Sequence, residues 1–256
     1  MPNFIFALLL GLTTAGCGGG GGTSAAPDPP AQGIADITLL FMGNSHTSFH
    51  NLPETVAAMV RAARPGRTVA QVEAPGWMFL EERAADPASL ELLDRRRWSF
   101  VILQAQKYST SGLFEYSIDG AVALARRARS ASAVPILFPE WPRRGINETQ
   151  RIYDLHVSIA QRAPACVAPI GQAWDLALAR YPTLVLHDAD GNHSAPAGAF
   201  LAALVIATTI TGAPPDTLPF LPQAGVAEDV QAQLRGVAAE TVLAYAPRQW
   251  CPGDPM

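Results

Sequence analysis

A serine in the first fifth of the chain and an Asp-x-x-His near residue 190 are the residues best suited to chemistry. Ser45 ends the run Gly43-Asn44-Ser45, and Asp190 and His193 lie three residues apart. A serine hydroxyl is a weak nucleophile until a base within hydrogen-bond reach removes its proton. His193 can be that base, and a carboxylate three residues away can orient it and stabilise the imidazolium. These residues predict nucleophilic catalysis if the fold brings them together.

The elements that must position them indicate an α/β fold. Apolar runs predict strands, and amphipathic runs between them predict helices. The strands are expected at 37–42, 68–73, 100–104 and 135–138. The clearest helices are expected at 53–63, 115–129, 148–162, 171–180, 197–209 and 226–245. Strands that alternate with helices favour a three-layer α/β/α sandwich with a mostly parallel, flavodoxin-like sheet. Ligands of such sheets bind beyond the carboxyl ends of the strands, where Ser45 is expected.

This order of motifs resembles the SGNH/GDSL hydrolase superfamily over about residues 36 to 212. Residues 40–45 (LFMGNS) are similar to its first block, 74–76 (APG) to its second, and 190–203 to its last. The resemblance implies that Ser45 is the nucleophile, His193 the base and Asp190 the residue that orients His193. It also implies that the backbone amides of Ser45 and Gly76 bind the oxyanion, with no cofactor and no metal.

The third block departs from the family pattern. The family has a Gly-x-Asn whose side-chain amide completes the oxyanion hole, whereas this chain has Gln104-Ala105-Gln106. Gln104 or Gln106 is expected to replace that amide, and the sequence does not decide between them. A polar strand end without such a role is the alternative.

Further residues near the expected site are suited to binding a substrate. Asn44 adjoins the serine, Trp77 follows Gly76, and Glu140 and Trp141 follow the fourth expected strand. Each tryptophan is either a stacking platform for a sugar ring or a cover over the core.

The amino-terminal residues predict export. Residues 1–17 resemble a lipoprotein signal peptide that ends at Cys17, the expected site of lipidation, with an ordinary secretory signal as the alternative. Residues 18–34 read as a flexible tether, 35–248 as the hydrolase-like domain, and 249–256 as a C-terminal tail. In an oxidising compartment Cys166 and Cys251 either form a disulfide or remain buried thiols.

The predicted function is therefore that of a lipid-anchored, periplasmic or surface-facing serine ester hydrolase. The expected substrate is a small acyl ester, above all an acetyl ester of a carbohydrate. A non-catalytic glycan-binding lipoprotein and a sugar O-acyltransferase remain as alternatives on the same fold. With a net charge of −4, the chain gives no electrostatic reason to bind nucleic acid.

Overall fold

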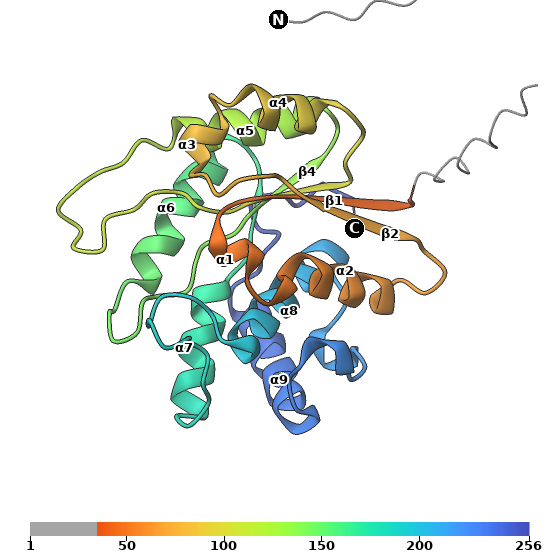
Figure 1. Cartoon of the computed structure of the whole chain (residues 1–256), viewed down its shortest axis with the longest axis vertical. Coiled ribbons are helices and arrows are strands. Elements are labelled where there is room, and N and C mark those ends of the chain that lie inside the picture. Colours follow the sequence, from red (N-terminus) through yellow and green to blue (C-terminus); the bar gives the residue numbers. More distant parts are fainter. Residues whose placement is uncertain (1–34, 256) are drawn as a thin grey trace, which may run out of the picture. The chain divides into compact units, whose positions relative to one another are not determined.

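The computed structural model describes residues 35–255, which are built around a parallel sheet of five strands (Figure 1). The strands are β1 (Ile37–Met42), β2 (Val69–Glu73), β3 (Phe100–Leu103), β4 (Val134–Leu137) and β5 (Cys166–Val167). They lie in the order β2-β1-β3-β4-β5, and all neighbouring pairs are parallel. This is the flavodoxin-like order, in which the direction of winding reverses between β1 and β3.

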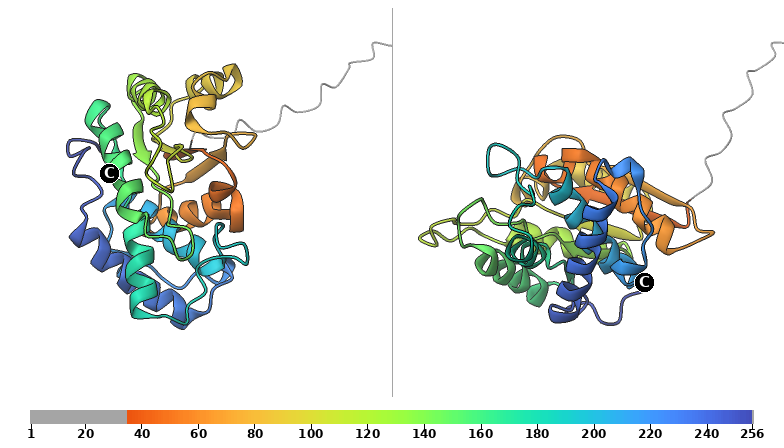
Figure 2. Two further views of the ribbon diagram at one scale, coloured as in Figure 1. Left: turned by 90° about the vertical axis from the view of Figure 1, so that its left-hand side faces the viewer. Right: turned by 90° about the horizontal axis from the view of Figure 1, so that it is seen from below.

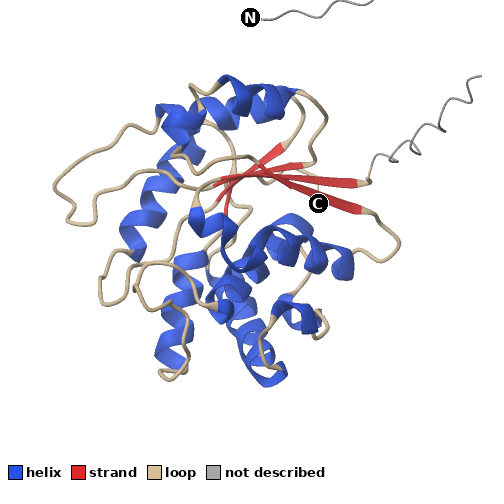
Figure 3. Ribbon diagram, in the orientation of Figure 1, coloured by secondary structure: helices blue, strands red, loops and turns tan. Residues whose placement is uncertain are grey.

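Helices cover both faces of the sheet, which confirms the predicted α/β/α sandwich (Figures 1 and 3). The helices are α1 (Ser45–Ser48), α2 (Leu52–Ala63), α3 (Leu80–Arg83), α4 (Pro87–Asp94), α5 (Asp119–Ser130), α6 (Thr149–Arg162), α7 (Ile170–Arg180), α8 (Pro196–Thr211) and α9 (Glu228–Ala244). Short 3₁₀ turns lie at Phe49–Asn51, Pro215–Thr217 and Pro222–Ala224. Two further views show the sheet between its two helical layers (Figure 2).

The alternation of side chains along the strands divides the core in two. Leu39 and Phe41 belong to a layer that includes buried residues of α2, α8 and α9. Leu40 and Met42 belong to the opposite layer, with buried residues of α4 and α5. Successive residues of a strand point to opposite faces, so a continuously apolar strand such as β1 fills both layers at once.

Most predicted elements begin and end within two residues of the observed ones. The helix expected from residue 115 is the exception, since α5 begins only at Asp119. The Ser117 hydroxyl accepts a hydrogen bond from the Asp119 N–H at 3.1 Å and holds the chain out of the helix before that point. The sequence did not predict α1, α3, α4 or β5, because each is short.

The C-terminal segment is fastened to the edge of the sheet. Cys166 of β5 and Cys251 form a disulfide, so the free-thiol alternative is wrong. The Val167 N–H donates to the Pro247 carbonyl at 2.9 Å, and Asp254 pairs with Arg129. The predicted signal peptide at 1–17, the lipidation site Cys17 and the tether at 18–34 lie outside the described residues. Between residues 35 and 255 there is no helix with the length and apolar character needed to cross a bilayer.

Candidate active site

The turn after β1 presents Ser45 at the carboxyl edge of the sheet, as the first residue of α1. The Asn44 side chain caps this short helix, because its Oδ1 accepts from the His46 N–H at 3.1 Å. The Ser45 N–H has no acceptor among residues 35–255. Both the hydroxyl and the amide of Ser45 are thus available to a ligand.

Gly43 lets a buried glutamine hold this turn from beneath. A Cβ atom at residue 43 would lie 2.2 Å from Thr47 Oγ1 and 2.3 Å from Gln104 Oε1, distances that are too short for real atoms. Gln104 Oε1 uses the space to accept from the Asn44 N–H at 2.8 Å and from the Thr47 hydroxyl at 2.9 Å. Only glycine permits this approach.

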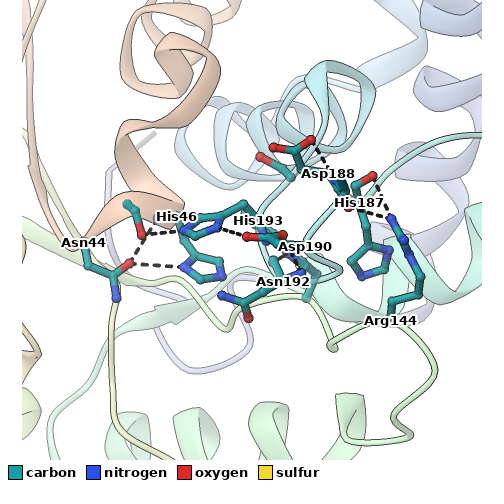
Figure 4. A network of polar contacts seen from close by, with 12 residues as sticks. Asn44, His46, Arg144, His187, Asp188, Asp190, Asn192 and His193 are labelled. Atoms are coloured by element: carbon teal, nitrogen blue, oxygen red, sulfur yellow. Dashed lines mark hydrogen bonds and ion pairs between the residues drawn. The ribbon is translucent and has the colours of Figure 1, made fainter.

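The loop before α8 folds around the carboxylate of Asp190. Its Oδ1 accepts the backbone N–H groups of Asn192 at 2.8 Å and His193 at 2.9 Å, and its Oδ2 lies 2.5 Å from His193 Nδ1 (Figure 4). The hydrogen bond with the imidazole and then the two backbone bonds hold the pKa of Asp190 well below its ordinary value. Asp190 is therefore an ionised carboxylate that fixes Nδ1 of His193 as a donor.

The other nitrogen of His193 reaches the serine. His193 Nε2 lies 2.8 Å from Ser45 Oγ, although the two residues are 148 positions apart in the chain. The imidazole is stacked on Phe49, with ring centroids 4.3 Å apart and planes 16° apart, and it has His46 5.0 Å away on another side. Ser45, His193 and Asp190 therefore form a continuous hydrogen-bonded chain. Phe49 carried no signal in the sequence, because its role depends on the turn that follows α1.

The structure contradicts the expectation that Trp141 binds substrate. Only 1% of its surface is exposed, and it stacks on Trp174 with centroids 4.6 Å apart. Its indole N–H donates to the Asn192 carbonyl at 2.9 Å. Trp141, four residues beyond the end of β4, therefore lies in the core and supports the Asp190–His193 loop.

Two further contacts hold the same loop. The Arg144 guanidinium donates to the carbonyls of His187 at 3.1 Å and Asp188 at 2.6 Å (Figure 4). His187 Nε2 lies 2.8 Å from the Pro142 carbonyl, and burial lowers the pKa of His187. The histidine is thus a neutral structural residue that joins the loop before α8 to the loop after β4.

A buried arginine ties together the loops after β1 and β2. The Arg83 side chain is fully buried and donates to the carbonyls of Gly43 at 2.7 Å and Gly76 at 2.6 Å. Gly76 has a φ of +75°, a conformation that favours glycine, and its N–H has no acceptor in the described part of the chain. Arg83 therefore fixes the relative positions of the two loops that carry the amides of Ser45 and Gly76.

The two glutamines are used differently from what the sequence suggests. Side chains two residues apart on a strand point to the same face of the sheet. Gln104 and Gln106 do not, because β3 ends at Leu103 and Ala105 between them has a φ of +75°, which breaks the alternation of side chains. Gln104 is completely buried, and its Nε2 donates to Glu140 at 2.5 Å. Gln106 Nε2 donates to the carbonyls of Lys107 at 2.9 Å and Ser117 at 3.1 Å. Both amide nitrogens already have acceptors within the protein.

A cleft of about 490 Å³ opens beside Ser45 and His193. Its remaining lining is mostly polar or aromatic, and consists of Asn44, His46, Phe79, Gln106, Lys107, Tyr108, Thr110, Tyr116, Glu140, Arg143 and Asn192. Asn44 and Glu140 thus lie where a substrate would bind, whereas Gly76 and Trp77 are not among the lining residues. Trp77 is 63% exposed and donates to the Ser48 hydroxyl at 3.0 Å. The sequence analysis missed Tyr108, Arg143 and Asn192, which reach the cleft from loops of irregular structure.

Comparison with known proteins places this fold. No protein-family model and no curated protein matches the sequence. Among solved structures, a candidate SGNH hydrolase from Slackia heliotrinireducens is 23% identical with a TM-score of 0.51, and the match covers 67% of this chain and 97% of that one. A DUF4886 family protein from Bacteroides uniformis is 15% identical with a TM-score of 0.59, over 82% of this chain and 96% of that one. The chain therefore has an SGNH hydrolase-like fold.

Proposed function

We propose that this protein is an exported serine ester hydrolase that acts on small acyl esters, above all acetyl esters of carbohydrates. The observation that carries the proposal is the hydrogen-bonded chain from Asp190 through His193 to Ser45, with contacts of 2.5 and 2.8 Å. This is the arrangement that activates a serine hydroxyl as a nucleophile.

Each residue of the chain has a defined step. Ser45 Oγ attacks the ester carbonyl carbon while His193 Nε2 accepts the hydroxyl proton, and Asp190 stabilises the imidazolium. His193 then gives the proton to the departing alkoxide, which leaves as the alcohol, and the acyl group remains on Ser45. A water molecule attacks the acyl-enzyme, passes a proton to His193, and releases the acid as Ser45 regains its proton.

The candidate donors to the negative charge that develops on the carbonyl oxygen are two backbone amides, of which that of Ser45 belongs to a residue lining the cleft. The N–H groups of Ser45 and Gly76 have no acceptor between residues 35 and 255, and Arg83 links the two loops that carry them. Donors that are fixed before the reaction stabilise an oxyanion most effectively. Asn44 adjoins Ser45 and lines the cleft, and its side-chain amide is the candidate third donor.

The cleft and the disulfide support the substrate class and the compartment. A cleft lined by tyrosines, asparagines and a threonine suits the hydroxyl groups of a sugar better than a long acyl chain. A disulfide such as Cys166–Cys251 persists in oxidising compartments. Both agree with an exported enzyme that removes a short acyl group from a carbohydrate.

Hydrolysis of 4-nitrophenyl acetate and of acetylated sugars by the purified protein tests the proposal. We expect Ser45→Ala to lower turnover at least ~10³-fold. Ser48→Ala is the matched control, because Ser48 lies on the same short helix, and it should retain most of the activity. Labelling of Ser45 by a serine-reactive fluorophosphonate should be stoichiometric and absent in the alanine variant.

The same assays separate the alternatives. If wild type and Ser45→Ala turn over esters equally, the protein is not a serine hydrolase and a glycan-binding role gains support. If a sugar alcohol intercepts the acyl group in preference to water, the enzyme is an acyltransferase that uses the same residues.

A further inference from the structure

One cation beside Ser45 has no partner among the described residues. Arg143 is exposed and lines the cleft together with Ser45, His193 and Asn192, and it also lines the neighbouring cavity on the side of Arg144. In the described part of the chain, no carboxylate oxygen lies within 4 Å of its guanidinium and no backbone carbonyl accepts a hydrogen bond from it. The residue therefore borders a hollow of small-ligand size with its guanidinium free to bind.

Most other arginines of the domain have acceptors. Seven form ion pairs with carboxylates: Arg61, Arg67, Arg95, Arg127, Arg129, Arg162 and Arg180. Others donate to backbone carbonyls, as Arg83, Arg144 and Arg151 do. Arg96 lies over the ring of Trp98. Arg97 also has no acceptor in residues 35–255, but it lies near the start of β3, away from the cleft. An unpaired arginine is thus unusual in this domain.

The backbone that carries Arg143 is held in place. Its N–H donates to Glu148 Oε1 at 2.9 Å, and Glu148 is almost completely buried. The carbonyl of the preceding Pro142 contacts the buried His187 at 2.8 Å. The side chain therefore starts from a fixed point beside the cleft.

The other charged side chains that line the cleft have partners of their own. Lys107 pairs with Glu81, and Glu140 is buried and accepts a hydrogen bond from Gln104 Nε2. Among the described residues that line the cleft, Arg143 is therefore the one charged side chain whose charged group has no hydrogen-bond or ion-pair partner.

We propose that Arg143 binds a carboxylate on the substrate, so that the preferred ester is an acyl ester of a carboxylated, uronic-acid-type sugar. This inference rests on the proposed ester hydrolase function and names its substrate class. The planar guanidinium donates two parallel hydrogen bonds to a carboxylate, and a charge-assisted pair is about twice as strong as a neutral hydrogen bond. Tyr108, Tyr116 and Asn192 line the same cleft and can bind the sugar hydroxyls.

A single arginine without a partner can pair with one negative charge. A phosphate monoester carries nearly two negative charges near neutral pH, and the second cation of the cleft, Lys107, is already paired. The structure therefore favours a carboxylate over a phosphate.

A matched pair of substrates tests the proposal. The substrates are an O-acetylated methyl glucuronoside with a free carboxylate and the methyl ester of that carboxylate, which carry the same acetyl ester but differ in charge. We expect wild type to prefer the acid at least ~10-fold in kcat/KM, and Arg143→Gln to lower that preference at least ~10-fold. Arg143→Lys should give an intermediate preference, because it keeps the charge and loses the planar fork. Arg95→Gln removes a remote surface charge and should leave the preference unchanged.

Several outcomes would overturn the proposal. Equal turnover of acid and methyl ester by wild type is one. An equal loss on both substrates in Arg143→Gln is another, since it would make Arg143 part of the oxyanion site. A stronger preference for the corresponding acetylated glucoside 6-phosphate would replace the carboxylate by a phosphate.

The proposed function can fail separately from this inference. If neither sugar ester nor 4-nitrophenyl acetate is hydrolysed, the hydrolase proposal is wrong, and calorimetric binding of the unacetylated methyl glucuronoside then decides the role of Arg143. Binding at least ~10-fold weaker in Arg143→Gln supports a carboxylate site, whereas equal binding or none rejects it. Thermal unfolding of each variant checks that the fold is intact.

Discussion

The two halves of the cleft are organised in opposite ways. On the proton-transfer half, Asp190, His193 and Ser45 are joined to one another, and no further partner is needed to complete the chain. On the half where we propose that the oxyanion binds, the amide of Ser45 lines the cleft without an acceptor among the described residues, while the side-chain amides of Gln104 and Gln106 bind other parts of the protein.

This difference shows that an amide group near the cleft can either remain free for a ligand or stabilise the fold. Gln104 joins the turn after β1 to Glu140 after β4, and Gln106 joins the loop after β3 to the start of α5. The two glutamines thus stabilise the loops around the cleft. The division predicts large effects on turnover from one half, and effects on stability from the other.

The largest effect is expected from the base. His193→Ala removes the group that accepts the Ser45 proton, and turnover of an acetyl ester should fall about 10⁴-fold or more. His50→Gln is a suitable control, because His50 contacts the carbonyl of Ser194 and not Ser45. A loss below ~10-fold in His193→Ala would contradict the proposed role of His193 as the base.

The orienting carboxylate should follow. Asp190→Asn keeps the shape but lets the imidazole take the wrong tautomer, and kcat should fall about 10²- to 10⁴-fold. The pKa of Asp190 is lowered, so the carboxylate stays ionised at pH values where an ordinary Asp would take up a proton. Activity lost between pH 7 and pH 4 should therefore not be due to protonation of Asp190. An Asn variant with near wild-type kcat would contradict the predicted role.

A buried histidine outside the cleft separates stability from activity. Burial lowers the pKa of His156 from 6.5 to about 4, and its Nε2 has no partner in the described structure. Because the unfolded chain binds the proton more readily, this group favours the folded state above pH 6.5, and its contribution is lost as the pH falls towards 4. The loss is expected to reach about 3 kcal/mol. Denaturant unfolding across this range should show a smaller decline for His156→Gln, and an unchanged decline would refute the assignment.

The smallest effects on turnover are expected from the glutamines. Gln104→Ala leaves the Asn44 N–H and the Thr47 hydroxyl without their buried acceptor, and should lower the free energy of unfolding by about 1–3 kcal/mol. Gln106→Ala should lower kcat less than ~10-fold. A fall of ~10²-fold or more in Gln106→Ala, with unchanged stability, would instead make Gln106 an oxyanion donor.

The sequence predicted the strands and the Asp190–His193 pair because both are local patterns: apolar runs mark β1, β3 and β4, and Asp190 and His193 lie in one loop. The meeting of His193 with Ser45, 148 positions away, was expected from the order of the motifs and not from local spacing. The directions of Gln104 and Gln106 depend on the positive φ of Ala105, a backbone feature that no residue type indicates. The contacts of Trp141 and Arg83 likewise depend on parts of the chain that are distant in sequence.

The joint between β5 and the C-terminal segment bears on how the protein avoids aggregation. β5 is an edge strand of two residues, and an open edge can pair with a strand of another molecule. The chain after α9 covers that edge through the bond from Val167 to Pro247, and the Cys166–Cys251 disulfide keeps it there. Reduction would remove the covalent part of this cover and leave the Val167–Pro247 hydrogen bond and the Arg129–Asp254 ion pair to hold the segment over the edge.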